Sequence, residues 1–177
     1  MNASDLDRLS SAVRDVPDFP KDGILFKDIT TLLADGELFR LSIAGLIETA
    51  GENKVDKVIG IDARGFIFGA AVADRIGAGF VPMRKKGKLP WQTIGMAYAL
   101  EYGEAEIELH KDSLSAGENI LLVDDLLATG GTAGAAIKLV RELGANLIAA
   151  SFLIELEGLN GRDVIGEGVR IESLLKY

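Results

Sequence analysis

The chain has 177 residues, a length typical of one compact domain with its own hydrophobic core. Hydrophobic residues make up 48% and charged residues 26%, which excludes an intrinsically disordered chain. The absence of cysteine excludes disulfides, thiolate metal sites and cysteine nucleophiles, and the net charge of −8 argues against nucleic-acid or membrane-surface binding. We therefore expect a single domain over residues 1–177, with no nucleic-acid partner and no membrane partner.

The amino-terminal residues 1–7 are acidic where a secretory signal would be basic, and no apolar stretch follows them. No segment of the chain approaches the roughly 18 uninterrupted apolar residues that a membrane span requires. These features favour a cytoplasmic location.

The first half of the chain alternates helical and strand patterns. Leu6, Leu9 and Val13 have helical spacing, and Ser4 stands before them as the expected N-cap. Residues 19–23 predict a turn, and residues 24–29 form a short apolar segment. The later elements are predicted as a helix at 37–50, a strand at 55–61, a helix at 66–76 and a strand at 80–83.

Residues 84–109 break this alternation with several glycines and Pro90, and we expect a long loop or loose hairpin of the kind that often acts as a lid. Beyond it, the apolar run at 120–123 predicts a buried strand. A helix at 133–143, closed by Gly144, and a strand at 147–156 follow. The pattern predicts an α/β fold with a mainly parallel central sheet flanked by helices, which binds ligands at the carboxyl ends of its strands.

The strongest functional signal begins where the 120–123 strand ends, with two carboxylates and then a small-residue loop that opens a helix. Backbone N–H groups at a helix N-terminus form an anion site, and glycines let a phosphate approach them. The residues expected to hold this phosphate are Ala128, Thr129, Gly130, Gly131 and Thr132. Asp124 and Asp125 suit the vicinal hydroxyls of a ribose. In the simpler interpretation Asp125 only caps the helix and the glycines only turn the chain, but the complete pattern favours the phosphate site.

Four of the five residues at 84–88 are basic, within an acidic protein. They form either a solvated, lysine-rich lid or a movable clamp that closes over an anion. Their position after a strand, inside the glycine-punctuated insertion, favours the clamp.

The segment at 120–132 resembles the phosphoribosyl pyrophosphate (PRPP) motif of type I phosphoribosyltransferases. Residues 18–30, 60–66 and 84–90 with 101–103 are similar to further segments of one branch of that family, the adenine phosphoribosyltransferases. These segments stand in the family's order and cover most of the chain. The resemblance implies the type I fold and the conversion of adenine and PRPP to AMP and pyrophosphate in purine salvage. It also implies Mg²⁺ held through the substrate without direct protein ligands, and a homodimer with its contact near the Arg64 loop.

The resemblance further implies roles for individual residues. Arg64, Arg84 and Lys88 would contact pyrophosphate, and the peptide bond between Asp62 and Ala63 would be cis. Main-chain groups of Leu25 and Lys27 would read the edge of adenine, between the apolar faces of Leu25 and Leu126. Glu101 would act as the acid–base residue.

Plain structural alternatives stand beside these roles. Arg64 would then pair with a surface acid at a strand-end turn, Glu101 would be a solvated loop residue, and Leu25 would belong to the core. The single histidine, His110, is expected at the surface near a strand end. Trp91 departs from the family pattern, which has a small or turn-forming residue in this loop.

Two other functions are compatible with the same motif. One is a phosphoribosyltransferase for an oxopurine such as hypoxanthine or guanine, against which the base-binding segment argues. The other is a regulator that senses PRPP without catalysis, although such proteins usually carry a nucleic-acid-binding module or a basic surface.

Overall fold

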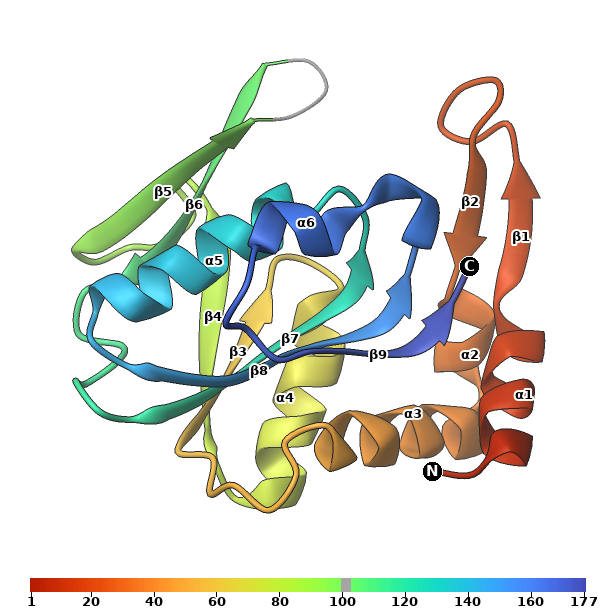
Figure 1. Cartoon of the computed structure of the whole chain (residues 1–177), viewed down its shortest axis with the longest axis horizontal. Helices are drawn as coiled ribbons and strands as arrows, with labels where there is room; N and C mark the ends of the chain where they lie inside the picture. The colour runs from red at the N-terminus through yellow and green to blue at the C-terminus, as the bar shows by residue number, and fades with distance from the viewer. Residues whose placement is uncertain (100–102) are drawn as a thin grey trace.

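In the computed structural model, which describes residues 1–99 and 103–177, seven strands form the central sheet in the order β5-β6-β4-β3-β7-β8-β9 (Figure 1). The strands are β3 (Lys57–Ile61), β4 (Gly79–Lys85), β5 (Thr93–Ala99), β6 (Glu104–His110), β7 (Asn119–Leu127), β8 (Asn146–Glu155) and β9 (Ile171–Lys176). The pairs β4–β3, β3–β7, β7–β8 and β8–β9 are parallel, whereas β6 is antiparallel to both of its neighbours, β4 and β5. The predicted α/β class with a mainly parallel sheet is confirmed.

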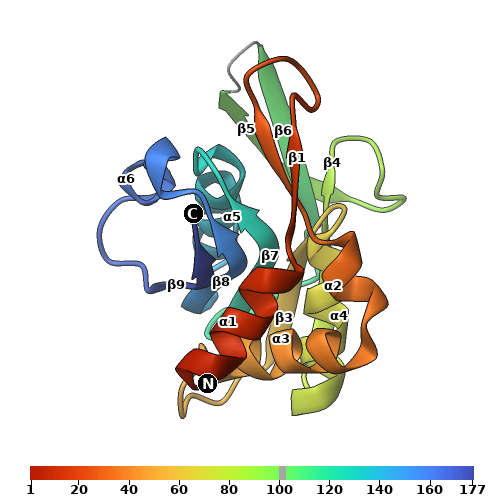
Figure 2. The same cartoon turned by 90° about the vertical axis from the view of Figure 1, so that its right-hand side faces the viewer.

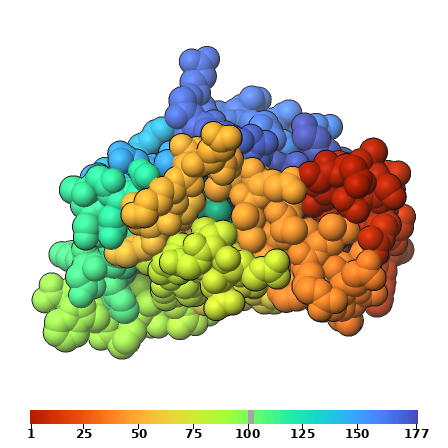
Figure 3. All heavy atoms as spheres, turned by 90° about the horizontal axis from the view of Figure 1, so that it is seen from below, coloured from red at the N-terminus to blue at the C-terminus, as the bar shows by residue number. Residues whose placement is uncertain are grey.

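Helices cover both faces of the sheet (Figure 2). Their bounds are α1 (Ala3–Ala12), α2 (Thr30–Ala34), α3 (Gly36–Glu48), α4 (Gly65–Ile76), α5 (Gly131–Glu142) and α6 (Gly161–Ile165), with a 3₁₀ turn at Glu157–Leu159. Seen from below, α1 and α3 in red and orange and α4 in yellow-green close the end opposite the hairpins (Figure 3). No helix in the described ranges is both long and apolar enough to cross a bilayer.

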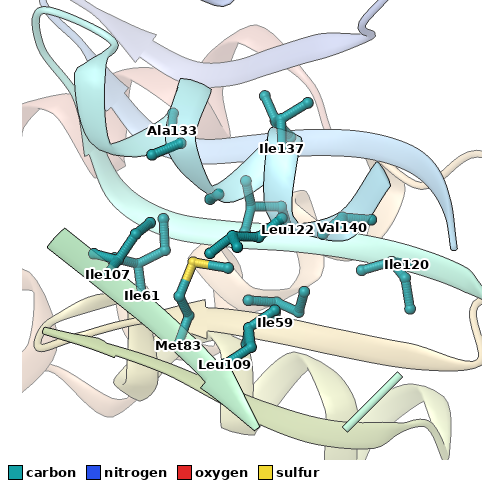
Figure 4. Close-up of a cluster of buried hydrophobic side chains, with 14 of the residues drawn as sticks. Ile59, Ile61, Met83, Ile107, Leu109, Ile120, Leu122, Ala133, Ile137 and Val140 are labelled. Atoms are coloured by element: carbon teal, nitrogen blue, oxygen red, sulfur yellow. The ribbon is translucent and has the colours of Figure 1, made fainter. Parts of the chain in front are cut away.

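The core has two layers because successive strand residues point to opposite faces of the sheet. In β3, Ile59 and Ile61 face α5, together with Ile120 and Leu122 of β7 (Figure 4). Val58 of β3 and Leu121 and Val123 of β7 point to the other face, where they pack against helices. This continuous burial explains why β7 reads as an uninterrupted apolar run.

Two hairpins rise at the end of the sheet where the parallel strands finish (Figure 1). One is the separate antiparallel pair β1 (Arg14–Pro17) and β2 (Leu25–Asp28). The other is β5–β6, which the sequence presented only as a long loop or loose hairpin. It is a regular hairpin that extends the central sheet, paired in register from Thr93 with His110 to Ala99 with Glu104.

Several local predictions were wrong in detail. Helix α1 begins at Ala3, and its N-cap is Asn2 instead of Ser4. Asn2 Oδ1 accepts the Asp5 backbone N–H at 2.9 Å, and the Asp5 carboxylate returns a bond to the Asn2 N–H, a reciprocal capping box that the Ser4 position lacks. The elements β1, α2, α6 and β9 were not predicted, because short or edge elements leave weak periodicity.

The capping geometry gives a direct stability prediction. Asn2→Ala removes the acceptor for the Asp5 N–H, and we expect the free energy of unfolding to fall by about 1 kcal/mol. Ser4→Ala, inside the first turn, is the matched control and should leave that free energy unchanged or slightly higher. Urea denaturation followed by circular dichroism measures both, and a larger loss for Ser4→Ala would contradict the assignment.

Candidate functional site

A cavity of about 340 Å³ opens at the carboxyl ends of β3 and β7, beside the β5–β6 hairpin. Its lining includes Asp62, Arg64, Lys85, Tyr98, Asp124, Asp125, Leu126 and Thr132. Most of these were singled out in the sequence, but Lys85 and Tyr98 were missed. Lys85 was present in the basic run at 84–88 and Tyr98 in the weak alternation before residue 100, but neither signal identifies a cavity residue without the fold.

The two aspartates lie within β7, which continues to Leu127, and not after its end as the apolar run suggested. Asp125 is 6% exposed, and its Oδ2 lies 2.8 Å from Arg64 Nε. Asp124 Oδ1 accepts the backbone N–H of Asp125 at 2.9 Å. Arg64 thus pairs with an acid, as the plain alternative required, but this acid is buried and lines the cavity.

Burial dominates the electrostatics of this pair. It raises the pKa of the Asp124 carboxyl well above the ordinary range, and the neighbouring Asp125 charge raises it further. Burial also raises the pKa of Asp125, but the Arg64 guanidinium opposes that shift. We therefore assign the negative charge of the free pair to Asp125.

The ion pairs of the basic run divide it between two carboxylates. Arg84 Nε lies 3.3 Å and Lys88 Nζ 3.5 Å from Asp62 Oδ2, at the end of β3. Arg84 also donates to the Lys88 carbonyl at 3.1 Å, so the two cations are held together beside the cavity. Lys86 turns away to Glu106, with Nζ 2.6 Å from the carboxylate. The peptide bond between Asp62 and Ala63 is cis, as the family resemblance implied.

The predicted phosphate loop lies at the N-terminus of α5, where Gly130 is the N-cap with φ of +80°. A second cavity, of about 80 Å³, is lined by residues 126–133 and Asp124. Helix N-terminal N–H groups and the helix dipole favour an anion in such a position. The structure therefore brings the phosphate loop and the carboxylate pair to adjoining cavities.

The residues predicted to read a base lie on β2, in the separate hairpin. Leu25 is 51% exposed, which contradicts its plain interpretation as a core residue. The Lys27 ammonium lies 2.6 Å from Asp15 and 3.9 Å above the Tyr177 ring. Between them in sequence, Phe26 places its ring 5.5 Å from the Arg64 guanidinium carbon. Phe26 thus links β2 to the cavity, a contact that the sequence did not reveal.

Two further expectations concern the β5–β6 hairpin. Glu101, the predicted acid–base residue, lies outside the described residues. His110 ends β6 half-buried, and its Nε2 accepts the Trp91 backbone N–H at 3.4 Å. The Trp91 side chain itself is 66% exposed.

Comparisons with known proteins were consistent with this geometry. The family model described as "Phosphoribosyl transferase domain" matches residues 31–164. A Neorhizobium galegae protein named adenine phosphoribosyltransferase is 51% identical over 178 residues, covering 100% of this chain and 98% of its own length.

Two solved structures extend the likeness to three dimensions. The crystal structure of adenine phosphoribosyltransferase from Rhodothermus marinus is 49% identical, with a TM-score of 0.95 over 99% of this chain and 100% of that one. The Saccharomyces cerevisiae adenine phosphoribosyltransferase, crystallised with an iminoaltritol bisphosphate and adenine, is 40% identical with a TM-score of 0.91, covering 98% and 99% of the two chains.

The raised pKa of Asp124 gives a prediction with a defined sign. A carboxyl whose pKa is raised by folding stabilises the fold at low pH and loses that contribution as pH rises through the folded-state pKa. Asp124→Asn removes a carboxyl that folding must keep protonated at pH 7, while its side-chain oxygen can still accept the Asp125 N–H. We expect it to raise the free energy of unfolding at pH 7 by about 1 kcal/mol, and by less at acidic pH.

Asp125→Asn is the matched control for this measurement. It leaves the Arg64 guanidinium without its charged partner, so the free energy of unfolding should fall. Thermal and urea denaturation across pH measure both variants. Destabilisation by Asp124→Asn at neutral pH would refute the assignment of the charge to Asp125.

Proposed function

The chain belongs to the phosphoribosyltransferase family and, within it, to the adenine phosphoribosyltransferases, and from this membership we propose how its residues carry out the reaction. The chain is a transferase that converts adenine and PRPP to AMP and pyrophosphate, a purine-salvage reaction. The observation that carries the residue assignments is the convergence of the phosphate loop, the Asp124–Asp125 pair and Arg64 on adjoining cavities.

In this proposal PRPP spans the carboxyl ends of β7 and β3. The 5-phosphate accepts hydrogen bonds from the backbone N–H groups of the phosphate loop and from its threonine hydroxyls. The residues of that loop are Ala128, Thr129, Gly130, Gly131 and Thr132. Asp124 and Asp125 accept hydrogen bonds from the ribose hydroxyls, and the pyrophosphate takes Arg64, Arg84 and Lys88 as its cationic partners. Because Arg84 and Lys88 face Asp62 in the free protein, pyrophosphate competes with this carboxylate for them.

Adenine is neutral, so its recognition depends on edge hydrogen bonds and apolar faces. We assign the edge to main-chain groups of Leu25 and Lys27 and the faces to Leu25 and Leu126. The exposure of Leu25 and the position of Leu126 on the cavity wall support this arrangement. A backbone donor and acceptor that match the 6-amino group and N1 of adenine would mismatch a 6-oxopurine.

The chemical step exchanges one bond at C1 of the ribose. The bond to N9 of adenine forms as the bond to the pyrophosphate oxygen breaks, pyrophosphate leaves with the electron pair, and N9 loses its proton. We propose Glu101 as the acceptor of that proton. A general base of this kind contributes roughly 10²–10⁴-fold to the rate.

Removing this carboxylate tests the assignment. We expect Glu101→Ala to reduce kcat by about 10²-fold or more while the chain stays folded. Steady-state kinetics at saturating adenine and PRPP give the comparison. Unchanged turnover would leave the acid–base role without a residue.

The enzymes of this family use a divalent cation, and we propose Mg²⁺ bound through PRPP. Mg²⁺ prefers phosphate oxygens and retained waters to an all-protein cage. The Asp62 carboxylate in the cavity wall suits a hydrated cation brought in on the substrate, with no direct protein ligand proposed. When bound, the ion would neutralise charge on the pyrophosphate leaving group.

We further propose a homodimer with its contact near the Arg64 loop. Ile67, on the first turn of α4, is 41% exposed, and Phe80 on β4 is 36% exposed. Phe80 packs edge-to-face on Phe66, with ring centroids 5.9 Å apart, so apolar side chains gather beside the loop. Sedimentation equilibrium measures the mass, and a monomer at micromolar concentration would contradict the dimer.

We also propose a cytoplasmic location. PRPP and AMP are multiply charged and do not cross a bilayer unaided, so an enzyme of purine salvage is expected where these compounds are made. Cell fractionation with an assay for AMP formation would test the location.

The reaction and the choice of base are tested together by a substrate panel. With PRPP and Mg²⁺, we expect AMP formation from adenine and no nucleotide from hypoxanthine, guanine or xanthine. Chelation of the metal should abolish turnover, and added Mg²⁺ should restore it. Turnover with an oxopurine would overturn the adenine assignment, and PRPP binding without turnover of any base would favour the regulator.

A further inference from the structure

The back of the phosphate loop rests on a turn from a distant part of the sequence. This turn joins the 3₁₀ segment to α6. Gly161, the first residue of α6, is buried. A Cβ atom on Gly161 would lie 2.2 Å from the Ala128 carbonyl oxygen, and one on Gly130 would lie 2.2 Å from the Gly161 carbonyl oxygen. The two backbones are therefore in direct contact, with no room for a side chain at either glycine.

An ion pair fixes the position of this turn. Arg162 Nε lies 2.6 Å from Glu155 Oε1, and its second terminal nitrogen lies 2.7 Å from Glu155 Oε2. Arg162 also donates to the Ile171 carbonyl at 3.0 Å, which ties the turn to β9. Two parallel charge-assisted bonds hold a guanidinium in one orientation far better than a single contact does.

The other end of this ion pair is rigid and close to the loop. Glu155 is 5% exposed and ends β8, where it stands in register with Leu127, the residue directly before the phosphate loop. The Leu156 N–H also donates to the Leu127 carbonyl at 2.9 Å. Arg162 lowers the pKa of Glu155, so the carboxylate keeps its charge at neutral pH. The chain thus leaves β8 beside the phosphate loop, and six residues later Gly161 contacts the back of that loop.

We infer that Gly161 and the Glu155–Arg162 pair are positioning residues that hold the phosphate loop in the shape that receives the 5-phosphate of PRPP. The inference rests on the proposed function of that loop. The loop at 128–132 consists of small residues, which have few side-chain contacts to hold their own conformation. Its front must stay free for the ligand, so its support has to come from behind. None of these three residues touches the ligand in this arrangement.

The alternative is that the ion pair only holds the C-terminal strand in place. The two roles differ in which kinetic constant they affect. A positioning role predicts a selective loss of PRPP affinity, because displacement of a binding group by a fraction of an ångström weakens the contact it makes. A general structural role predicts lower thermal stability with both substrate constants unchanged or changed alike.

The test uses Gly161→Ala in the full chain. We expect the KM for PRPP to rise about tenfold or more and the KM for adenine to stay within about twofold. Gly158→Ala, in the same segment, is the matched control, because no other atom lies within 4 Å of the Cβ atom that it would add. It should leave both constants unchanged.

A second pair of variants keeps the inference testable if Gly161→Ala does not fold. Arg162→Gln breaks the bidentate pair and should raise the KM for PRPP, while Arg162→Lys should restore part of the affinity. Lys176→Gln, which breaks the exposed pair between Lys176 and Glu157, is the control for loss of a nearby charge. A PRPP constant equal to that of the unaltered chain in both folded variants would overturn the positioning role.

Direct binding separates this inference from the proposed reaction. Calorimetric titration with ribose 5-phosphate measures the loop without catalysis. Weaker binding by Gly161→Ala and Arg162→Gln than by the unaltered chain supports the positioning role, even if no base is turned over. Tight binding by all of them contradicts it, even if AMP is formed.

Discussion

The pair of adjacent carboxyl groups near the end of β7, of which Asp125 is buried, constrains the surrounding structure. The negative charge assigned to Asp125 needs a cation beside it, because a buried charge without a partner strongly destabilises the fold. Arg64 supplies that cation from the loop after β3, which requires β3 and β7 to be neighbours. It also requires α4 to begin against β7, and there a Cβ atom on Gly65 would lie 2.6 Å from Asp124 Oδ1.

In the ligand-free protein, the basic side chains of this site are held in ion pairs with carboxylates of the same site. Asp125 faces Arg64, and Asp62 faces Arg84 and Lys88. A polyanionic substrate bound by these cations, as we propose, would exchange one set of partners for another and would not have to desolvate isolated cations. The free carboxylates can then accept hydrogen bonds from hydroxyl groups, so the arrangement suits a ligand with both phosphates and a sugar.

The sequence predicted best what depends on local order. The strand, the carboxylates, the loop and the helix at 120–132 are contiguous, so their order along the chain could be predicted from the sequence. Contacts between distant segments could not be predicted from the sequence. Lys85 and Tyr98 line the cavity only because the sheet places β4 and the β5–β6 hairpin on the same side of β3. Even the N-cap was misplaced from Asn2 to Ser4, because both residue types cap helices and only the Asp5 geometry separates them.

Backbone contact explains why glycines were the residues whose place in the structure was hardest to predict from the sequence. A phosphate loop that offers N–H groups must bring main chain close to the ligand in front and to main chain behind. Gly130 and Gly161 meet this requirement together although 31 positions separate them in the sequence. Read alone, Gly161 is one of 21 glycines in the chain and carries no chemical signal. Its contact with the loop requires the absence of a side chain, and the sequence shows this requirement only when the partner backbone is known.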